Sequence, residues 1–367
     1  SLYQRDFGVV PRFRAGVHGG PVVAGECGDD KRQIVYFGDT INTAARIQGV
    51  APVGIIAIGQ FFVIVSGEFD LSQGSLITAQ VVIAGNLVGQ DESRTIPVML
   101  LMFVFGAAIG LVNGLITTLL KVPSFIVTLG MMLALLGGIL WWTGGAATGN
   151  PADNFRAIGR GGLKDVPIID FLPWSVLVLA AWLALAIWLT KRPLGKQMVA
   201  VGDNATAAHF AGVRTWWVTT RAFMISSTSA TVAGILLVGY AGVHPSVGRG
   251  YEFIAITAVV LGGVVLGGGR GWVVAAVAGA FVLEALFLLL TIAGVPSTLR
   301  DTVQGVIIIA AVAYAGVSFR ARRPKPRAAA STQSSPDPGK EPEPPMALAQ
   351  SESHALRGEG PNVNLGG

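Results

Sequence analysis

The stretch VIVSGEFDLSQGS, residues 63–75, places two acidic residues between two apolar runs of the chain. The run before it, 53–66, is shorter than the about 20 residues that a membrane-spanning helix needs, and only GEFD separates it from the next run, 71–89. Charge and non-helical backbone are tolerated at membrane depth only inside protein or beside a water-filled cavity. We therefore expect residues 53–89 to form one broken or re-entrant membrane unit.

Apolar runs of this kind continue along most of the chain. Of its 367 residues, 52% are hydrophobic and 13% are charged, and the mean hydropathy is +0.61. A soluble domain carries about 25% charged residues, so the composition indicates a membrane protein. Beyond residue 90 the runs are 96–119, 122–143, 171–190, 216–241, 253–269, 272–293 and 297–318. The sequence therefore predicts an all-α polytopic membrane protein with about 8–9 transmembrane helices.

A basic cluster directly follows the last apolar run and decides the predicted orientation. Its members are Arg320, Arg322, Arg323, Lys325 and Arg327. Such a cluster is typical of a cytoplasmic membrane flank rather than of a nucleic-acid patch, so we expect no nucleic-acid partner. Counting back from it places loops 120–122, 191–214 and 269–271 in the cytoplasm, and loops 144–170, 242–252 and 294–296 outside. Basic residues are nearly balanced between the loops, so this orientation depends on the tail.

The two ends of the chain differ from this middle block. Residues 320–367 begin with the basic cluster and then become rich in Pro, Ser, Ala, Gly and charge, so we expect a disordered cytoplasmic tail. Residues 1–48 have a mixed, soluble composition. Cys27 is the only cysteine, which excludes an internal disulfide and argues against a cysteine-based metal site. We expect no metal site in this chain.

Polar residues gather at the predicted helix break. Glu68 and Asp70 lie at the break, and Ser72 and Ser75 follow at the start of the next helix, where small polar groups can satisfy open N–H donors. One interpretation is an ordinary loop with a capping aspartate. The other is that these residues line the substrate path or fix its shape, because acids within a membrane need a partner or water.

The segment LVNGLITTLLKVPSFIVTLGMM, 111–132, carries polar residues within apolar sequence. Pro123 suits the first turn of a helix, where its missing N–H costs nothing. Asn113 and Thr128 are the candidates for function here. Such residues are more often interhelical hydrogen-bond partners than substrate ligands, and the sequence leaves both roles open.

A polar segment, GKQMVAVGDNATAAHFAGV, connects two apolar runs at residues 195–213. Asp203 or Asn204 can cap a short helix that reaches Ala211, and Gly212 can close it. The helix is either an ordinary connection or a surface that docks into a groove on a cytoplasmic partner. The glycine-rich stretch AVVLGGVVLGGGRGW, 258–272, allows close backbone contact but lacks the GxxxxGK[ST] pattern of a phosphate-binding loop.

These four segments, in this order, resemble the ribose/xylose-type permeases of ABC importers. SGEFDLSQGS corresponds to that family's SGGIDLSVGS, PSFIVTLG to P-x-FI-x-TLG, GDNATAAHFAGV to GGNxxAAxxSGI, and LGGVVLGGGRG to IGGxxLxGGRG. The resemblance covers about residues 53–318. Glu68 and Phe69 stand where the family has Gly-Ile, and Gln73 replaces a small apolar residue, so the sugar stays undefined.

The resemblance implies an inner-membrane channel subunit of a bacterial importer for a simple sugar. It implies a homodimer or a sister permease, ATP-binding subunits on the cytoplasmic face, and an extracytoplasmic binding protein; ATP and Mg belong to the partners, and this chain binds no cofactor and is no enzyme. The coupling segment would comprise Gly202, Asp203, Asn204, Ala207, Ala208 and Gly212. The translocation-path candidates are Glu68, Asp70, Ser72, Ser75, Asn113 and Thr128. The family has one further span before residue 53, so we expect the permease domain, 49–319, to lack its first span.

The segment FRAGVHGGPVVAGECGDDKRQIVYFGDTINTAARIQ, 13–48, predicts two strands followed by a helix capped by Asp39 or Thr40. Asn42 and Arg46 would share one helix face, and an amide beside a guanidinium suits a nucleotide. The segment resembles class III adenylate/guanylate cyclases, with their patterns GIHTGPVVAG and GDTVNxAAR. In that family the two metal-binding aspartates lie in a more N-terminal part, and two-metal catalysis requires them. We therefore expect a non-catalytic α/β remnant over 1–48.

The alternative function is a membrane-anchored nucleotide cyclase or a regulatory nucleotide-binding module. A simple anchor needs one or a few spans without family-specific loops. The four ordered segments of the membrane block therefore favour the transporter.

Overall fold

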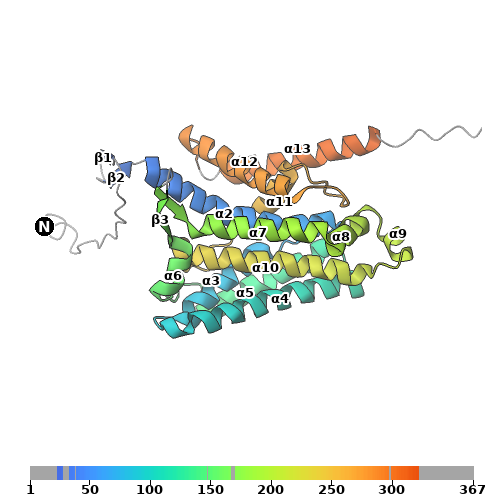
Figure 1. Cartoon of the computed structure of the whole chain (residues 1–367), viewed down its shortest axis with the longest axis horizontal. Helices are drawn as coiled ribbons and strands as arrows, with labels where there is room; N and C mark the ends of the chain where they lie inside the picture. Colours follow the sequence, from blue (N-terminus) through green and yellow to red (C-terminus); the bar gives the residue numbers. More distant parts are fainter. Residues whose placement is uncertain are drawn as a thin grey trace, which may run out of the picture. The chain divides into compact units, whose positions relative to one another are not determined.

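The computed structural model describes residues 23–27, 33–37, 39–146, 148–166, 170–296 and 299–321. Most of them are helical (Figure 1). Within these residues, five helices are long and apolar enough to cross a membrane: Glu92–Leu119, Ser124–Thr143, Trp174–Lys191, Thr215–Ala241 and Val273–Ile292. Shorter apolar helices cover Gly49–Val65, Gln73–Val88, Tyr251–Leu261 and Asp301–Ala310. The predicted class, an all-α polytopic membrane protein, is confirmed, whereas the number of crossings stays a prediction. The predicted disordered tail lies outside the described residues.

Helix α2, Asp39–Val65, joins the two parts of the chain that the sequence separates. It contains the predicted helix that begins near Asp39 and the first apolar run up to Val65, with Pro52 inside it. Proline removes one i→i−4 hydrogen bond, but neighbouring helices can compensate within a packed bundle. From Ala51 to Val65 every residue of α2 is buried. The predicted boundary at residue 48 is therefore not a break in the backbone.

Helix α10, Thr215–Ala241, is the central element of the core. It packs against α2, α3 (Gln73–Val88), α4 (Thr95–Leu119) and α6 (Asp153–Arg160). The face of α4 towards α10 carries Gly106, Gly110 and Gly114, and a Cβ on Gly110 would lie 2.6 Å from the carbonyl oxygen of Phe223. Small residues at four-residue spacing let the two backbones approach closely, as in membrane helix pairs.

The outer helices present apolar side chains away from the core. These helices are α4, α5 (Ser124–Thr143), α7 (Trp174–Lys191) and α12 (Val273–Ile292). Only 17% of the most apolar window of α7 and 22% of that of α5 is buried. Exposed side chains such as Leu133 and Trp188 match a hydrocarbon environment.

Among the described apolar helices, α3 and α11 (Tyr251–Leu261) are too short to cross a bilayer and begin inside the bundle. α3 has 16 residues and α11 has 11. At 1.5 Å per residue they are about 24 and 16 Å long, against about 30 Å of hydrocarbon. Each follows a 27-residue helix, α2 or α10, after a short non-helical segment. α2 and α10 pack together and run in opposite directions (Figure 1). This confirms the predicted broken unit over 53–89 and adds a second one.

The predicted run 253–269 is wrong as a single helix. α11 ends at Leu261, and residues 262–272 form turns before α12 begins. Gly263, Gly268 and Gly269 have positive φ there, between 73° and 83°. Residues with a side chain disfavour that conformation. These glycines, which the hydropathy pattern includes in an apolar helix, are therefore turn residues.

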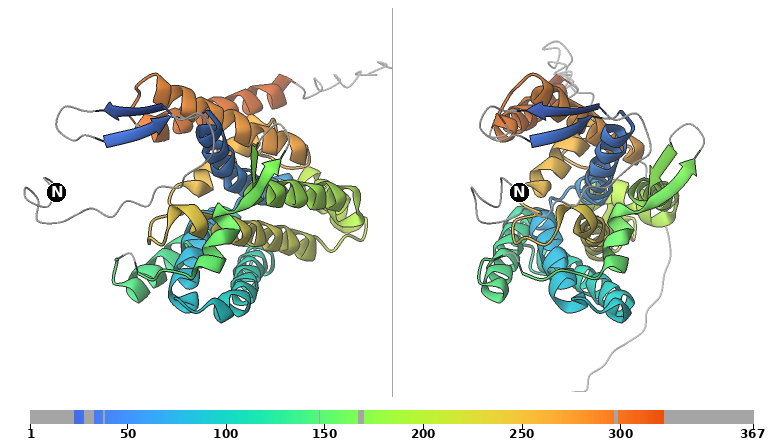
Figure 2. Two further views of the ribbon diagram at one scale, coloured as in Figure 1. Left: turned by 60° about the vertical axis from the view of Figure 1, so that its left-hand side comes forward. Right: turned by 90° about the vertical axis from the view of Figure 1, so that its left-hand side faces the viewer.

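The two ends of the bundle differ in their connections. One end holds α8 (Pro193–Asp203), α9 (Ala205–Phe210) and the last turn of α13 (Arg300–Ala321), at the right of Figure 1. The other holds the 3₁₀ turn η1 (Glu92–Arg94), α6, and the antiparallel strands β3 (Gly162–Val166) and β4 (Asp170–Pro173), as Figure 2 shows from two further sides. The sequence predicts only a loop where α6, β3 and β4 lie.

The N-terminal strands follow the prediction. β1, Val23–Cys27, pairs antiparallel with β2, Gln33–Phe37, with Gly25 opposite Val35. Residues 13–22 of the segment predicted to form two strands and a helix lie outside the described residues.

Candidate functional site

Asp70 is fully buried at the break between α2 and α3. Its Oδ1 accepts hydrogen bonds from the backbone N of Ser72 at 2.9 Å and from Ser72 Oγ at 2.6 Å. Its Oδ2 accepts one from Ser226 Oγ of α10 at 2.6 Å. A buried carboxylate needs such donors, because transfer out of water without them is costly. Asp70 therefore ties the start of α3 to the central helix.

Further side chains extend this contact into a polar network between four helices. Asn113 Nδ2 of α4 donates to Ser72 Oγ at 2.9 Å, and Gln73 Nε2 donates to Ser226 Oγ at 2.7 Å. Asn113 has the interhelical bonding role that the sequence leaves open. Ser72, at the N-cap position of α3, makes no side-chain capping bond, but Asp70 accepts from its backbone N, as a capping aspartate of the loop would. Ser226 is the member that the sequence does not single out.

Thr128 and Glu68 lie beside this network without joining it. Ser124 at the start of α5 accepts a hydrogen bond from the backbone N of Phe69 at 3.1 Å. Thr128 Oγ1 donates to the carbonyl of Ser124 at 2.8 Å, within its own helix. Glu68 is partly exposed. The contacts around Phe69 fix the segment that enters α3, and Ser124, which the sequence misses, provides them.

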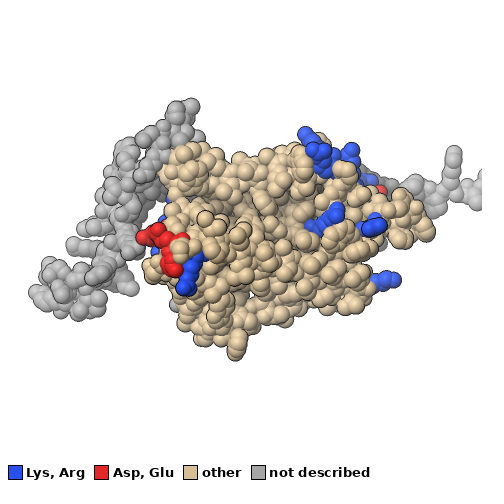
Figure 3. Space-filling model, turned by 60° about the horizontal axis from the view of Figure 1, so that its bottom comes forward, with Lys and Arg blue, Asp and Glu red and all other residues tan. Residues whose placement is uncertain are grey.

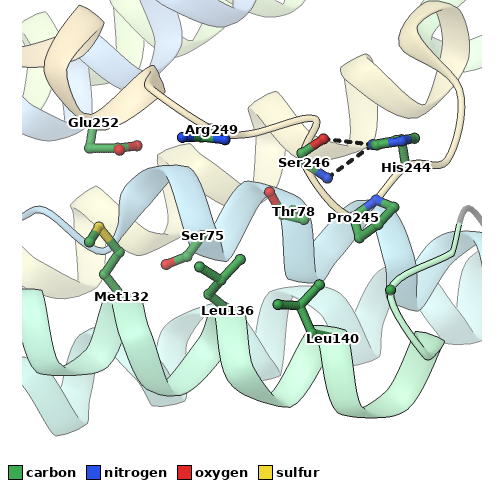
Figure 4. A pocket seen from close by; sticks show the side chains of 11 residues that line it. Ser75, Thr78, Met132, Leu136, Leu140, His244, Pro245, Ser246, Arg249 and Glu252 are labelled. Carbon is green, nitrogen blue, oxygen red and sulfur yellow. Dashed lines mark hydrogen bonds between the residues drawn. The ribbon is translucent and has the colours of Figure 1, made fainter.

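A cavity of about 510 Å³ lies between α3, α5 and the start of α11 (Figure 4). Among the predicted path residues, only Ser75 lines it. Its other lining residues are Thr78, Met132, Leu136, Leu140, Gly145, His244, Pro245, Ser246, Arg249 and Glu252. The sequence analysis singles out none of them, since they come from three separate segments.

The short helix predicted in the coupling segment is present as α9, whereas the sequence does not predict α8 before it. Ala208 is buried, so among the predicted coupling residues it cannot face a partner. Asn204 caps α9: its Oδ1 accepts from the backbone N of Ala207 at 2.9 Å, whereas Asp203 is the last residue of α8. The helix ends at Phe210, and Gly212 closes it with φ of 81°. Ala207 is exposed, as is 84% of Phe210. A short capped helix with an exposed small and aromatic face can act as a docking element.

Four glycines, which we call the glycine junction, hold this segment against the rest of the bundle. They are Gly67, Gly202, Gly268 and Gly269. A Cβ on Gly202 would overlap the carbonyl oxygen of Val65 and lie 2.6 Å from Gly269 N. Gly269 N donates to that same carbonyl at 2.9 Å. The end of α8, the end of α2 and the turn before α12 therefore meet backbone to backbone.

Asn42 and Arg46 both lie on the first turns of α2, four residues apart. Their backbone positions share one helix face, as predicted. Side-chain contacts of residues 39–48 lie outside the described residues. Within the described part of the chain, no three His, Cys, Asp or Glu side chains gather as a metal site would require.

Comparison with known proteins gives the family. Residues 44–312 match the model described as branched-chain amino acid transport system / permease component. The chain belongs to this permease family of ABC importers. The ribose import permease protein RbsC of Escherichia coli K12 is 34% identical over 279 residues, covering 74% of this permease and 85% of RbsC. The autoinducer 2 import system permease protein LsrC of Salmonella typhimurium LT2 is 33% identical over 269 residues, 71% and 74% of the two chains.

A second match concerns the beginning of the permease. Residues 8–73 match the adenylate and guanylate cyclase catalytic domain. The two matched ranges overlap at 44–73, which holds most of α2. The comparison with solved structures found no match for this chain.

Proposed function

We propose that the permease is the membrane subunit of an ABC importer for a ribose- or xylose-like sugar, coupled to ATP hydrolysis on separate subunits. The proposal is supported by the similarity to RbsC and LsrC, whose names specify import of ribose and of autoinducer 2. The observation that carries the coupling is the glycine junction. It joins the exposed helix α9, through the end of α8, to the break that precedes α3.

In this mechanism, closure of the ATP-binding subunits pushes on α9. Gly202 contacts Val65 and Gly269 through backbone atoms, which cannot rotate away as side chains can. A displacement of α8 therefore reaches the broken unit α2–α3 and the turn before α12 together. Packed backbones transmit strain because protein interiors have little free volume.

The translocation-path residues divide into two groups in this proposal. Asp70, Ser72 and Asn113 act on the path by fixing the position of α3, since their polar atoms bond mainly to one another. Ser75 faces the cavity and can contact substrate directly. Glu68 lies in the segment that leads into α3, and Thr128 bonds to Ser124, which holds that segment.

The end of the bundle with α8 and α9 faces the cytoplasm in this proposal. Figure 3 shows Lys and Arg side chains gathered there, while acidic and basic groups are mixed at the opposite end. An excess of Lys and Arg marks the cytoplasmic side of bacterial inner-membrane proteins. The opposite end, with α6 and the β3–β4 hairpin, would then receive the sugar-binding protein, and the permease would pair with a second copy or a sister subunit.

The coupling proposal is tested by co-purification with the ATP-binding subunits and by sugar uptake in the same cells. Ala207→Asp places charge on α9 and Gly212→Asp places it in the turn that closes α9, and both variants are expected to reduce co-purification and uptake. Ala293→Asp is the matched control, because Ala293 is also exposed but lies in the loop at the opposite end. If the α9 variants assemble and transport as well as the control, α9 is not the docking element.

A further inference from the structure

The cavity beside Ser75 lies where the two short helices begin. Gly248, just before α11, packs on the first turn of α3, and its backbone N donates to Thr78 Oγ1 at 3.0 Å. Gly250 has φ of 89°, which turns the chain into α11. Discontinuous helices that begin inside a membrane protein leave open N–H donors near the middle of the bilayer, and transporters place substrates there.

Glu252 has an unused acceptor at this point. The residue is 6% exposed, and its Oε2 has no hydrogen-bond partner within the described structure. A methyl group on Gly74 would overlap Oε2, so the carboxylate lies directly over the first turn of α3. Buried polar atoms are nearly always paired, and a buried carboxylate oxygen that faces a cavity is therefore positioned for a ligand donor.

The walls of the cavity differ in chemistry (Figure 4). Ser75, Arg249 and Glu252 form the polar side. Arg249 is an exposed cation at the rim, and Glu252 is a buried anion. Met132, Leu136 and Leu140 of α5 form the apolar side. Thr78, Ser246 and His244 already bond within the protein. Ser75 Oγ donates to the carbonyl of Ser72 at 3.0 Å, so it can only accept a hydrogen bond from a ligand. The volume of about 510 Å³ falls within the roughly 300–1,000 Å³ of small-molecule sites.

We propose that this cavity binds a neutral polyhydroxylated small molecule during its passage, with Glu252 accepting hydrogen bonds from its hydroxyl groups. Arg249 would donate to other oxygens of the ligand, Ser75 Oγ would accept from one of its hydroxyls, and the α5 side chains would cover the C–H face. The balance of one cation and one anion favours a ligand without net charge. The inference deepens the proposed function and rests on it.

The test measures protection of a thiol at the rim by sugar. Cys27→Ser removes the only cysteine, and Ser246→Cys places one at the exposed rim of the cavity. The purified permease in detergent is labelled with a maleimide in the presence of D-ribose, D-xylose or ribitol, with sodium acetate as a charged control. A polyol in the cavity is expected to slow labelling at least twofold at saturation.

Two variants change the cavity, one on its polar side and one on its apolar side. Glu252→Gln removes the charged acceptor and is expected to raise the half-protecting sugar concentration about tenfold, since a hydrogen bond to a charged group contributes roughly that factor. Leu136→Trp fills the cavity without touching Glu252 and is expected to abolish protection. Glu92→Gln, an exposed glutamate outside the cavity, makes the same charge change and is expected to leave protection unaltered.

Sugar uptake by the assembled importer separates the two proposals. If unmodified permease imports a polyol but Glu252→Gln and Leu136→Trp leave protection and uptake unchanged, the cavity assignment is overturned and the proposed function stands. Protection that persists in Glu252→Gln while uptake is lost also overturns it, because the carboxylate then serves a step other than binding. If no polyol is imported or protects, the proposed function itself fails.

Discussion

Replacing Gly202 with alanine tests the glycine junction. The added Cβ would overlap the carbonyl oxygen of Val65 and lie 2.6 Å from Gly269 N, and both are backbone atoms that cannot move aside alone. Overpacking of this kind costs about 1–3 kcal/mol. The hydrogen bond from Gly269 N to Val65 would break, which costs about 1–3 kcal/mol more in a buried place. Alanine's better helix propensity offsets up to about 1 kcal/mol, so the net loss is about 1–5 kcal/mol.

The loss is measured by unfolding the purified permease in mixed micelles with increasing SDS, followed by circular dichroism. Gly137→Ala is the matched control, because Gly137 is a helical glycine with nothing within 4 Å of the added carbon. The control is expected to gain up to about 1 kcal/mol. In the assembled importer, Gly202→Ala is also expected to lower sugar uptake per ATP hydrolysed. Equal stability and equal coupling in Gly202→Ala and Gly137→Ala would refute the close contact.

Three more predictions concern other parts of the permease. Asp70→Ala is expected to destabilise it by about 2–5 kcal/mol in the same unfolding assay, since three hydrogen bonds of roughly 0.6–1.7 kcal/mol each are lost, and Asp70→Asn is expected to have a smaller effect. A loss confined to uptake would mean that Asp70 contacts substrate instead. Asn204→Ala removes the N-cap of α9, which contributes about 0.5–2 kcal/mol, and is expected to weaken co-purification of the ATP-binding subunits. Asn204→Asp keeps a capping oxygen and is expected to retain the co-purification. Equal recovery of the partners with both variants would contradict this. Purified permease incubated with ATP and Mn²⁺ is expected to form no cyclic nucleotide; product that disappears in Asn42→Ala or Arg46→Ala would instead favour the cyclase alternative.

Local signals in the sequence predict much of this structure. The acids and serines of 63–75 predict the break before α3, and Asn204 and Gly212 predict both ends of α9. Each feature depends on residues that are neighbours in the chain, so hydropathy and capping rules apply to it directly. The four ordered segments predict the family for the same reason.

Features that depend on distant residues could not be predicted. Ser226 bonds to Asp70 across 156 positions, and nothing in its own helix distinguishes it from the neighbouring serines. Hydropathy also extends the run 253–269 through turn glycines, because glycine is neutral in such averages while its positive φ appears only in the fold. Glu252 reads as the end of an outer loop, and only the packing of α11 on Gly74 buries it.

Helix α2 runs without a break through the overlap of the two matched ranges. The number of residues in this part of the helix therefore sets the direction in which the segment before it points. Each residue in an α-helix turns the chain by about 100° and advances it by about 1.5 Å. A single deletion between Arg46 and Pro52 would therefore rotate the β1–β2 hairpin by about 100° around the helix axis, whereas removing seven residues would restore its direction to within about 20°. Recombination that preserves the reading frame does not by itself preserve this phase, so fused segments of arbitrary length would point a cyclase-like hairpin in arbitrary directions.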